Sequence, residues 1–445
     1  MRNFFLLSAS TLAGLVAVHS ATAQVDFAEF DLKNGLHVIL HEDHSTPIVA
    51  VTVMYHVGSK NENPERTGMA HFFEHLLFEG SEHIARGEFD GYVEGAGGVL
   101  NANTTQDRTF YYELLPSNQL ELGLWLESER MLHARVDGTG IETQREVVKE
   151  EKRQRYDNQP YGQMMPTTFD RAYAEHPYRW TPIGSLDHLN AASYEEFMDF
   201  YKTFYVPNNA VLSIAGDLDI KATKKLIKAY FEDIPAGTRE IPRPTIEEPI
   251  RTEELRDTIF GKDALPMIVQ AYPVPAQGTD DYYAVEMLNQ VLSGGESSRL
   301  NRRVVDEEQL ALFCGAFNFG LEDPGLTFAY AMASMGVDPG AVEVAMNEEV
   351  ERMRVELISD LELQKLKNQM EAQLIRSQRS MASIAESLAN YHLYFGDANL
   401  INTEIERYLA VTPEDIRKAA QTYYAPEQRV TLYFLQAPTA ETSKQ

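Results

Sequence analysis

The 445-residue chain contains a single cysteine, and this scarcity limits what the protein can be. One cysteine excludes an intramolecular disulfide framework. Cys314 lies among Leu312, Phe313 and Phe317, so we expect a buried structural thiol rather than a catalytic nucleophile. The stability of the fold must come from packing, with bound metal as the other available source.

Basic residues are also scarce. The chain has 39 lysines and arginines against 67 aspartates and glutamates, which gives a formal net charge of −28 at pH 7. Such an acidic protein repels polyanions, so nucleic acid and anionic membrane surfaces are excluded as partners. The charge favours basic peptides as ligands, although a net charge does not describe the field inside one cleft.

Long hydrophobic runs are missing beyond the first residues. Arg2 precedes an apolar run over residues 4–18, and Ala21-Thr22-Ala23 before Gln24 is typical of a signal peptidase site. We expect residues 1–23 to be a cleaved signal peptide, which predicts export, to the periplasm of a Gram-negative bacterium. The alternative is a retained membrane anchor, but the run is shorter than the ~20 residues that span a bilayer. After cleavage no membrane span is expected.

The chain contains an internal repeat. Residues 193–207 align with residues 412–426 without a gap, and the offset between the two copies is constant. The matched pairs are Glu195 and Glu414, Phe197 and Ile416, Thr203 and Thr422, Tyr205 and Tyr424, Pro207 and Pro426, and Val211 and Val430. Each copy predicts a capped helix, a proline stop and then a strand, over residues 210–215 or 429–435. Two unrelated helix-to-strand units are the alternative, but the constant offset favours duplication.

The repeat requires a boundary between two similar domains. Residues 233–250 contain four prolines among charged residues, which is typical of an extended linker. We therefore expect an N-terminal domain over residues 24–232, a C-terminal domain over residues 251–437 and a tail over residues 438–445. Each domain then has about 200 residues, an ordinary size for one core.

One pentapeptide carries the chemistry. His71, Glu74 and His75 stand in the order H-x-x-E-H within residues 68–79, which have helical spacing. On a helix the two histidines are one turn apart on one face, where both can bind one zinc ion. Glu74 can reach the water that zinc acidifies and can take its proton. The alternative is a pair of helix histidines satisfied by other contacts, with a surface glutamate.

A zinc site of this kind needs a third protein ligand. Residues 142–153 predict a second helix that is rich in carboxylates. Glu151 follows Val148 and Val147 by three and four residues and so projects from the apolar face, whereas Glu150 lies on the solvated face. Helical phase therefore favours Glu151.

These residues resemble a known family. The pentapeptide, followed at some distance along the chain by Glu151, is similar to the pitrilysin or insulinase family of zinc peptidases, which includes mitochondrial processing peptidase. Further landmarks are residues 34–36, 68–71, 100–104, 176–178, 183–184 and 205–209. The resemblance implies an α+β fold of two homologous domains, each with an antiparallel sheet and helices. It also implies one Zn²⁺ per chain, held by His71, His75 and Glu151, with Glu74 as the base.

The resemblance further implies a mode of substrate binding. In the family a peptide pairs as an extra strand with a sheet edge that matches Leu100, Asn101, Ala102 and Asn103. Turn chemistry is an equally good reading of the two asparagines. In the second half, residues 294–300 resemble a glycine-rich family segment, and we take Arg299 from it as a further substrate-binding candidate.

The chain departs from the family pattern at two places. Gln144 stands where a glutamate often supports the third ligand, and a neutral amide there still hydrogen-bonds. Val305 and Leu312 stand where active members often carry a substrate-holding arginine and tyrosine, although Arg302 and Arg303 lie close by. We therefore expect a heterodimer with a homologous zinc-less subunit, or else a homodimer.

The sequence thus predicts an exported zinc endopeptidase that acts on extended peptides or unfolded segments. A non-catalytic scaffold or chaperone-like subunit of a peptidase complex is the first alternative, favoured by Val305 and Leu312. A binding module with a purely structural zinc is the second. Three protein ligands beside a base argue against that second alternative, because they leave a coordination position open.

Overall fold

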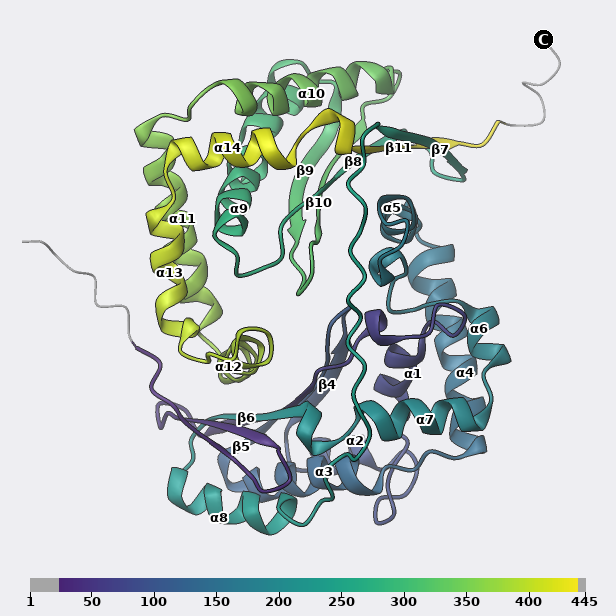
Figure 1. The fold of residues 1–445 in the computed structure, drawn as a ribbon, viewed down its shortest axis with the longest axis vertical. Helices are drawn as coiled ribbons and strands as arrows, with labels where there is room; N and C mark the ends of the chain where they lie inside the picture. Colours follow the sequence, from purple (N-terminus) through teal and green to yellow (C-terminus); the bar gives the residue numbers. More distant parts are fainter. Residues whose placement is uncertain (1–23, 439–445) are drawn as a thin grey trace, which may run out of the picture.

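The computed structural model describes residues 24–438, which form two halves that are each built around one sheet (Figure 1). The expected signal peptide, residues 1–23, lies outside the described residues, as does the expected tail apart from Pro438. In residues 24–438 we find no helix with the length and apolar character that crossing a membrane requires.

The two sheets share one topology. The first contains β1 (Ala28–Asp31), β2 (His37–Glu42), β3 (Ile48–Tyr55), β4 (Val99–Thr104), β5 (Thr109–Pro116) and β6 (Ala210–Gly216), in the order β1-β2-β6-β3-β5-β4. The second contains β7 (Leu255–Gly261), β8 (Met267–Pro273), β9 (Ala311–Phe319), β10 (Leu326–Ala333) and β11 (Val430–Gln436), in the order β7-β11-β8-β10-β9. Apart from β1, each strand of the first sheet has a counterpart in the second.

The sheets are mixed, which refines the expectation of antiparallel sheets. The last strand of each half returns and inserts between the first two strands of the shared pattern, β6 between β2 and β3, and β11 between β7 and β8. The flanking strands run in opposite directions, so the inserted strand must be parallel to one of them. It is parallel to β2 or β7 and antiparallel to β3 or β8. The α+β class with two similar domains is confirmed.

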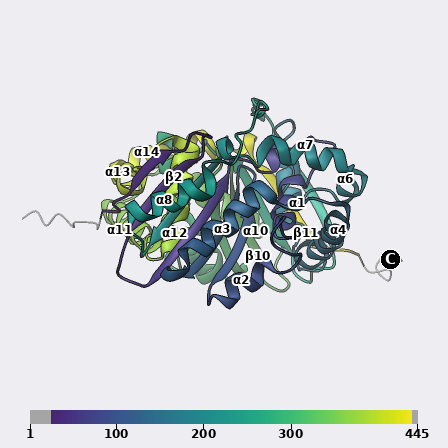
Figure 2. The ribbon, with the colours of Figure 1, turned by 90° about the horizontal axis from the view of Figure 1, so that it is seen from below.

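Helices surround both sheets. The first half has α1 (Met69–Leu76), α2 (Phe89–Gly95), α3 (Leu120–His133), α4 (Gly138–Lys152), α5 (Met164–Ala172), α6 (Leu186–Ala191), α7 (Tyr194–Phe204) and α8 (Ile220–Phe231). The second half has α9 (Asp280–Ser293), α10 (Pro339–Val355), α11 (Asp360–Ser377), α12 (Met381–Phe395), α13 (Leu400–Ala410) and α14 (Pro413–Tyr423). The view from below in Figure 2 shows α3 and α8 side by side across one face of the first sheet.

The repeat is visible in matching elements. Helices α7 and α14 have the same length and begin and end at matched residues of the repeat, and the short 3-10 helix that follows keeps the same offset. The next strands, β6 and β11, have equal length and are shifted by one residue from that offset. Both helices begin with a capping box, Ser193 with Glu196 and Thr412 with Asp415. The same local sequence signals therefore start and stop both copies.

Each half places one helix on the sheet of the other half. Helix α12 packs on β3 and β6, where Ile384 and Leu388 join Ala50 and Met54 in one buried cluster. In return, α5 packs on β8 and β11, where its Phe169 joins a buried cluster of the second sheet. When the offset of the repeat is applied, α5 falls within α12, so the two helices are equivalent (Figure 1).

The chain crosses between the halves in an extended segment. Residues 232–254, all of them described, contain no helix or strand, and the expected linker over residues 233–250 lies within this segment. The crossing is fixed by contacts: Arg243 donates to the backbone oxygen of His56 over 2.6 Å, and Glu248 accepts hydrogen bonds from three successive backbone nitrogens, those of residues 174–176.

Candidate metal centre

Helix α1 is held in place at its start by a buried carboxylate. Glu62 accepts hydrogen bonds from the backbone nitrogens of Gly68 (2.9 Å) and Ala70 (2.8 Å). Gly68 has a φ of 97°, and a Cβ there would lie 3.0 Å from the backbone oxygen of Ile183, so glycine is required at this position. Along the helix, Tyr111 donates to the backbone oxygen of Phe73 (3.1 Å). The helix is thereby fixed from several sides.

Helix α4 supplies the third residue of the cluster. Asp137 caps the helix by accepting from the backbone nitrogen of Gly140 (2.8 Å), and Val148 is fully buried. Glu151 lies near the last turn, and its Oε2 is 3.1 Å from Nε2 of His75 and 3.4 Å from Nε2 of His71. The exposed Glu150 points away and pairs with Arg153. The structure therefore brings together the three residues named from the sequence.

The electrostatics of the cluster favour a charged carboxylate. Partial burial opposes ionisation, but hydrogen bonds from His71 and His75 hold the pKa of Glu151 well below its ordinary value. The other oxygen, Oε1, is 2.9 Å from Arg155, one helical turn further on. Glu151 thus presents one oxygen to the histidines and the other to an arginine.

The donor set fits a zinc ion. Two imidazole nitrogens and one carboxylate oxygen lie within 4.8 Å of one another. Tetrahedral bonds of zinc to nitrogen and oxygen separate neighbouring ligand atoms by about 3.3–3.5 Å, which is close to the measured 3.1 and 3.4 Å. The imidazole rings of His71 and His75 meet at 80°, so their nitrogens converge from different directions. Three protein ligands leave a fourth position open.

Glu74 stands beside this cluster and outside it. Its Oε2 accepts a hydrogen bond of 2.5 Å from the hydroxyl of Thr104, the last residue of β4. The contact joins helix α1 to the edge of the sheet. Thr104 is not among the site residues predicted from the sequence, although it closes the strand segment that the family resemblance marked.

A cleft of about 1110 Å³ opens over these residues and is lined from both halves. Residues 101–106 of β4 and the following turn form one wall. The apolar side chains that face them include Met164, Met165 and Phe169 of α5 and Phe319 of β9. Within residues 24–438, β4 pairs with β5 alone, so its other edge keeps unpaired backbone groups.

Some of the predicted substrate-binding residues line this cleft and others do not. Asn101, Ala102 and Asn103 line the cleft. Leu100 is partly buried and packs against the hydrophobic core of the first half. Arg299 is not among the cleft residues in the described chain, because it pairs with Glu362 of α11 over 2.8 Å. The prediction for Arg299 rested on a glycine-rich segment and could not anticipate this ion pair.

The chain departs from the family pattern at Gln144 and at Val305 and Leu312, and the structure shows the surroundings of these positions. Gln144 donates to Glu79 over 2.5 Å, and within the described residues its side chain forms no hydrogen bond with a member of the cluster. Leu312 is exposed on β9, and Arg303 is engaged by Glu308, Glu348 and Glu349. The neighbouring arginine at position 303 is therefore occupied by glutamates of the same half.

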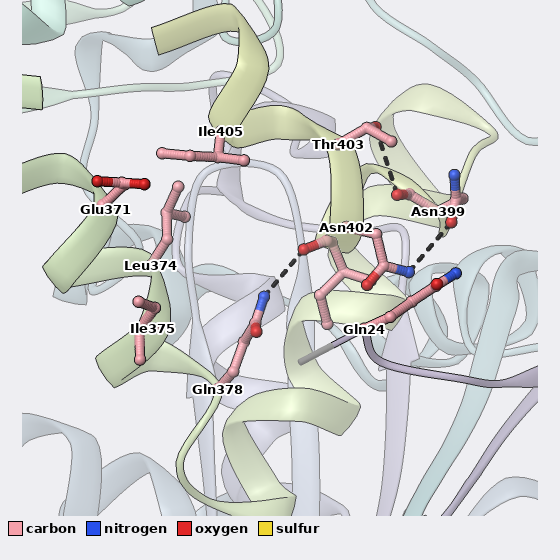
Figure 3. Close-up of a pocket in the computed structure, with 10 residues that line it drawn as sticks. Gln24, Glu371, Leu374, Ile375, Gln378, Asn399, Asn402, Thr403 and Ile405 are labelled. Atoms are coloured by element: carbon pink, nitrogen blue, oxygen red, sulfur yellow. Dashed lines mark hydrogen bonds between the residues drawn. The ribbon is translucent and has the colours of Figure 1, made fainter. Parts of the chain in front are cut away.

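Two other features of the second half lie apart from the cluster. Cys314 is half-buried on β9, where burial and the nearby Asp306 raise the pKa of its thiol to about 12. This supports the expectation of an unreactive thiol. A cavity of about 260 Å³ lies between α11 and α13. Figure 3 shows Gln24 beside Asn402 at this cavity. Among the described residues that line it, Glu371 is the only acidic, basic or histidine residue.

Known proteins share both halves of this chain. Residues 37–179 match the family described as Insulinase (Peptidase family M16), and residues 191–370 match Peptidase M16 inactive domain. The zinc protease PqqE of Helicobacter pylori is 31% identical over 406 residues, which are 90% of this chain and 91% of that protein.

Solved structures agree with the sequence matches. A protease from Helicobacter pylori superimposes with a TM-score of 0.88 at 29% identity, over 93% of this chain and all (100%) of the other. The first half of the periplasmic protease PqqL from Escherichia coli shares the fold, with a TM-score of 0.76 at 20% identity over 93% of this chain and 92% of its own. From its two matched regions and its close relative, the chain belongs to the pitrilysin/insulinase family of peptidases, peptidase family M16.

Proposed function

We propose that the protein is an exported zinc endopeptidase that cleaves extended peptides or unfolded segments, with His71, His75 and Glu151 as the metal ligands. One observation carries this proposal: the three ligand atoms and the carboxylate of Glu74 meet beneath a free sheet edge, in a cleft large enough for a peptide. The zinc protease PqqE, a relative over nine-tenths of the chain, supports it.

When bound, zinc would supply Lewis-acid chemistry, by polarising the scissile carbonyl and acidifying a water molecule. Glu74 takes the proton of the attacking water and later delivers it to the amine nitrogen that leaves. Thr104 holds Oε2 of this carboxylate, which leaves Oε1 to carry the proton. The hydrogen bond also fixes the distance between the base and the strand that binds substrate.

The free edge of β4 binds the substrate in this proposal. A peptide that pairs with Asn101, Ala102 and Asn103 becomes a further strand of the first sheet, and its carbonyl groups then lie along the cleft. Backbone pairing accepts any extended sequence, so the apolar side chains of α5 across the cleft select among side chains. Folded substrates are excluded because they do not offer a free strand.

We further propose that a homologous subunit without zinc completes the site. Val305 and Leu312 offer no group that holds a substrate carbonyl, and Arg303 is engaged by three glutamates. The partner would supply the missing donors. The division into domains at residues 24–232 and 251–437, and the periplasm as the location, belong to the same proposal.

The experiment measures zinc content and cleavage of a mixed peptide pool by residues 24–445, with and without a homologous partner encoded nearby. We expect about one zinc ion at this centre and full cleavage only with the partner. Glu74→Gln should keep the zinc and lower the cleavage rate by about 10²- to 10⁴-fold. Glu150→Gln, on the exposed face of α4, is the matched control and should change neither quantity.

Two outcomes contradict the proposal. Cleavage that survives Glu74→Gln would show that another group is the base. Zinc binding without cleavage, even with the partner present, would favour the scaffold alternative, which the residues at positions 305 and 312 keep open.

A further inference from the structure

Two histidines and a glutamate that the proposed reaction does not use come together outside the cleft. His83 follows α1 by one short turn, and Glu129 and His133 lie on the last turns of α3. Each offers one ligand atom, and these atoms lie within 4.8 Å of one another. The imidazole rings of His83 and His133 are 5.3 Å apart and meet at 88°. The set has the same chemistry as His71, His75 and Glu151.

Glu129 is the buried member of this cluster. Only 6% of the residue is exposed, and its carboxylate accepts from the hydroxyl of Ser81 (2.5 Å) and faces Nδ1 of His83 (2.9 Å). Within residues 24–438 no lysine or arginine forms an ion pair with it. A buried carboxylate needs a compensating positive charge, and the nearby groups able to provide or bind one are the two histidines.

Several backbone hydrogen bonds hold the chain around the cluster. Ser81 and Ala134 form an isolated β-bridge, and the backbone nitrogen of Glu82 donates to the backbone oxygen of His133 (3.1 Å). The hydroxyl of Ser81 also accepts from the backbone nitrogens of His83 and Ile84. The turn after α1 is thus fastened to the end of α3, so the three side chains are held together before any ligand binds.

The side chain of Glu82 adds a fourth contact. Its Oε2 lies 3.1 Å from Nδ1 of His133, in the way that a carboxylate commonly orients a metal-binding imidazole. The side chain of His83 is 57% exposed, so an ion can enter from solvent without any opening of the fold. Imidazole nitrogens with carboxylate oxygen suit zinc among the common divalent ions.

We propose that His83, Glu129 and His133 form a second zinc site, which fastens the segment after α1 to the C-terminal end of α3. The site does not face the cleft, so its role is structural. Zinc that binds the folded chain and not the unfolded chain stabilises the fold by mass action. Helix α1 ends at Leu76, shortly before the fastened residues Gly80 and Ser81, so zinc here acts on the chain next to the C-terminal end of the metal-binding helix.

The test counts zinc in four forms of the full chain after dialysis: the wild type, His71→Ala/His75→Ala, His83→Ala/His133→Ala, and the variant with all four changes. We expect about two, one, one and no zinc ions per chain, respectively. The His71→Ala/His75→Ala form, loaded with Co²⁺, should show the visible absorption of a low-symmetry site. Added zinc should raise its melting temperature, and this rise should be lost in the fourfold variant.

His44→Ala is the matched control. His44 also contacts two carboxylates, Asp217 (2.6 Å) and Glu42 (3.0 Å), but it is not part of a cluster with a second histidine in the described residues. Its removal should leave the zinc content unchanged. His83→Asn, at an exposed position, replaces the double variant if the latter fails to fold.

A wild type that binds one zinc ion, together with a His71→Ala/His75→Ala form that binds none, would overturn the inference. His83 would then be a simple ion-pair partner of Glu129. This outcome leaves the proposed peptidase centre untouched, because cleavage and its dependence on Glu74 are measured separately.

Discussion

Glu151 divides its two carboxylate oxygens between different partners. Oε2 faces the two histidines, and Oε1 faces Arg155, which lies on the surface one turn further along the chain. A carboxylate fixed at one oxygen loses little freedom when its other oxygen binds a metal, so we infer that Arg155 is a positioning residue for the proposed ligand Glu151.

We predict that Arg155→Ala weakens zinc binding at this centre by about tenfold, because Glu151 loses its orientation. Arg155→Lys should restore part of the affinity. Competition with a chelator measures the change. Arg153→Ala removes a similar exposed arginine that pairs with Glu150, and an equal loss in this control would contradict the positioning role.

The sequence predicted this centre as far as local spacing allows. The order of His71, Glu74 and His75, with helical phase for Glu151, was enough to name four residues that the structure places together. The hydrogen bond from Thr104 depends on how β4 meets α1, and the cluster of His83 with Glu129 depends on a bridge between distant residues. Neither contact has a periodic pattern in the sequence.

Helix α1 depends on a buried charge behind it. Arg130 is fully buried, donates to the backbone oxygen of Leu77 (3.0 Å) just after the helix, and contacts Glu127 and Glu113. Burial, and then the negative charge of Glu127, raise the pKa of Glu113 well above its ordinary value. Burial therefore favours the protonated form of Glu113, and both carboxyl groups face the same arginine.

We predict that Arg130→Met lowers the free energy of unfolding by about 3–5 kcal/mol, because it removes the buried positive charge that faces both Glu127 and Glu113. Glu113→Gln should cost less than about 1 kcal/mol, because burial raises the pKa of Glu113 and so favours its neutral form, which an amide resembles. Urea unfolding measures both values. A large loss in Glu113→Gln would show that this carboxyl is charged in the folded protein.

At the scale of elements, the repeat was predictable and the exchange of helices was not. A constant offset in the sequence identifies equivalent helices such as α7 and α14. The offset does not show which sheet a helix covers. The packed faces of α5 and α12 are apolar, and an apolar face could pack on either sheet. The insertion of β6 and β11 into their sheets likewise depends on pairing between strands that are far apart in the sequence.

The two halves of the molecule are joined by a charged contact as well as by the exchanged helices. Lys60 is buried and lies 2.9 Å from Asp107 and 2.5 Å from Glu322, and His56 contacts Glu322 over 2.9 Å. Burial opposes ionisation of Glu322, but the hydrogen bonds and charges of His56 and Lys60 lower its pKa to about 2. The carboxylate is thus charged in the folded protein down to strongly acidic pH.

This shift predicts the direction of a pH effect on stability. The folded-state pKa of Glu322 is below its unfolded value of 4.5, so the stabilisation is complete above pH 4.5 and is lost as the pH falls through about 2. We expect Glu322→Gln to lower the free energy of unfolding at pH 7 by at most about 3 kcal/mol, and the difference should vanish near pH 2.

Unfolding by urea at a series of pH values measures this difference. Glu65→Gln is the control, because Glu65 is exposed and its side chain forms no ion pair within residues 24–438. A Glu322→Gln difference that stays constant with pH would show that the contact between the halves does not depend on this charge.

The exchange of helices also sets an order of events during synthesis. The strands of the first sheet are complete once β6 ends at Gly216, but α12, which covers one face of that sheet, does not begin until Met381. A growing chain therefore carries an uncovered apolar sheet for much of its translation. Ribosomes that stall before Phe395 should release fragments that aggregate or stay bound to folding helpers, even though every strand of the first half has been made.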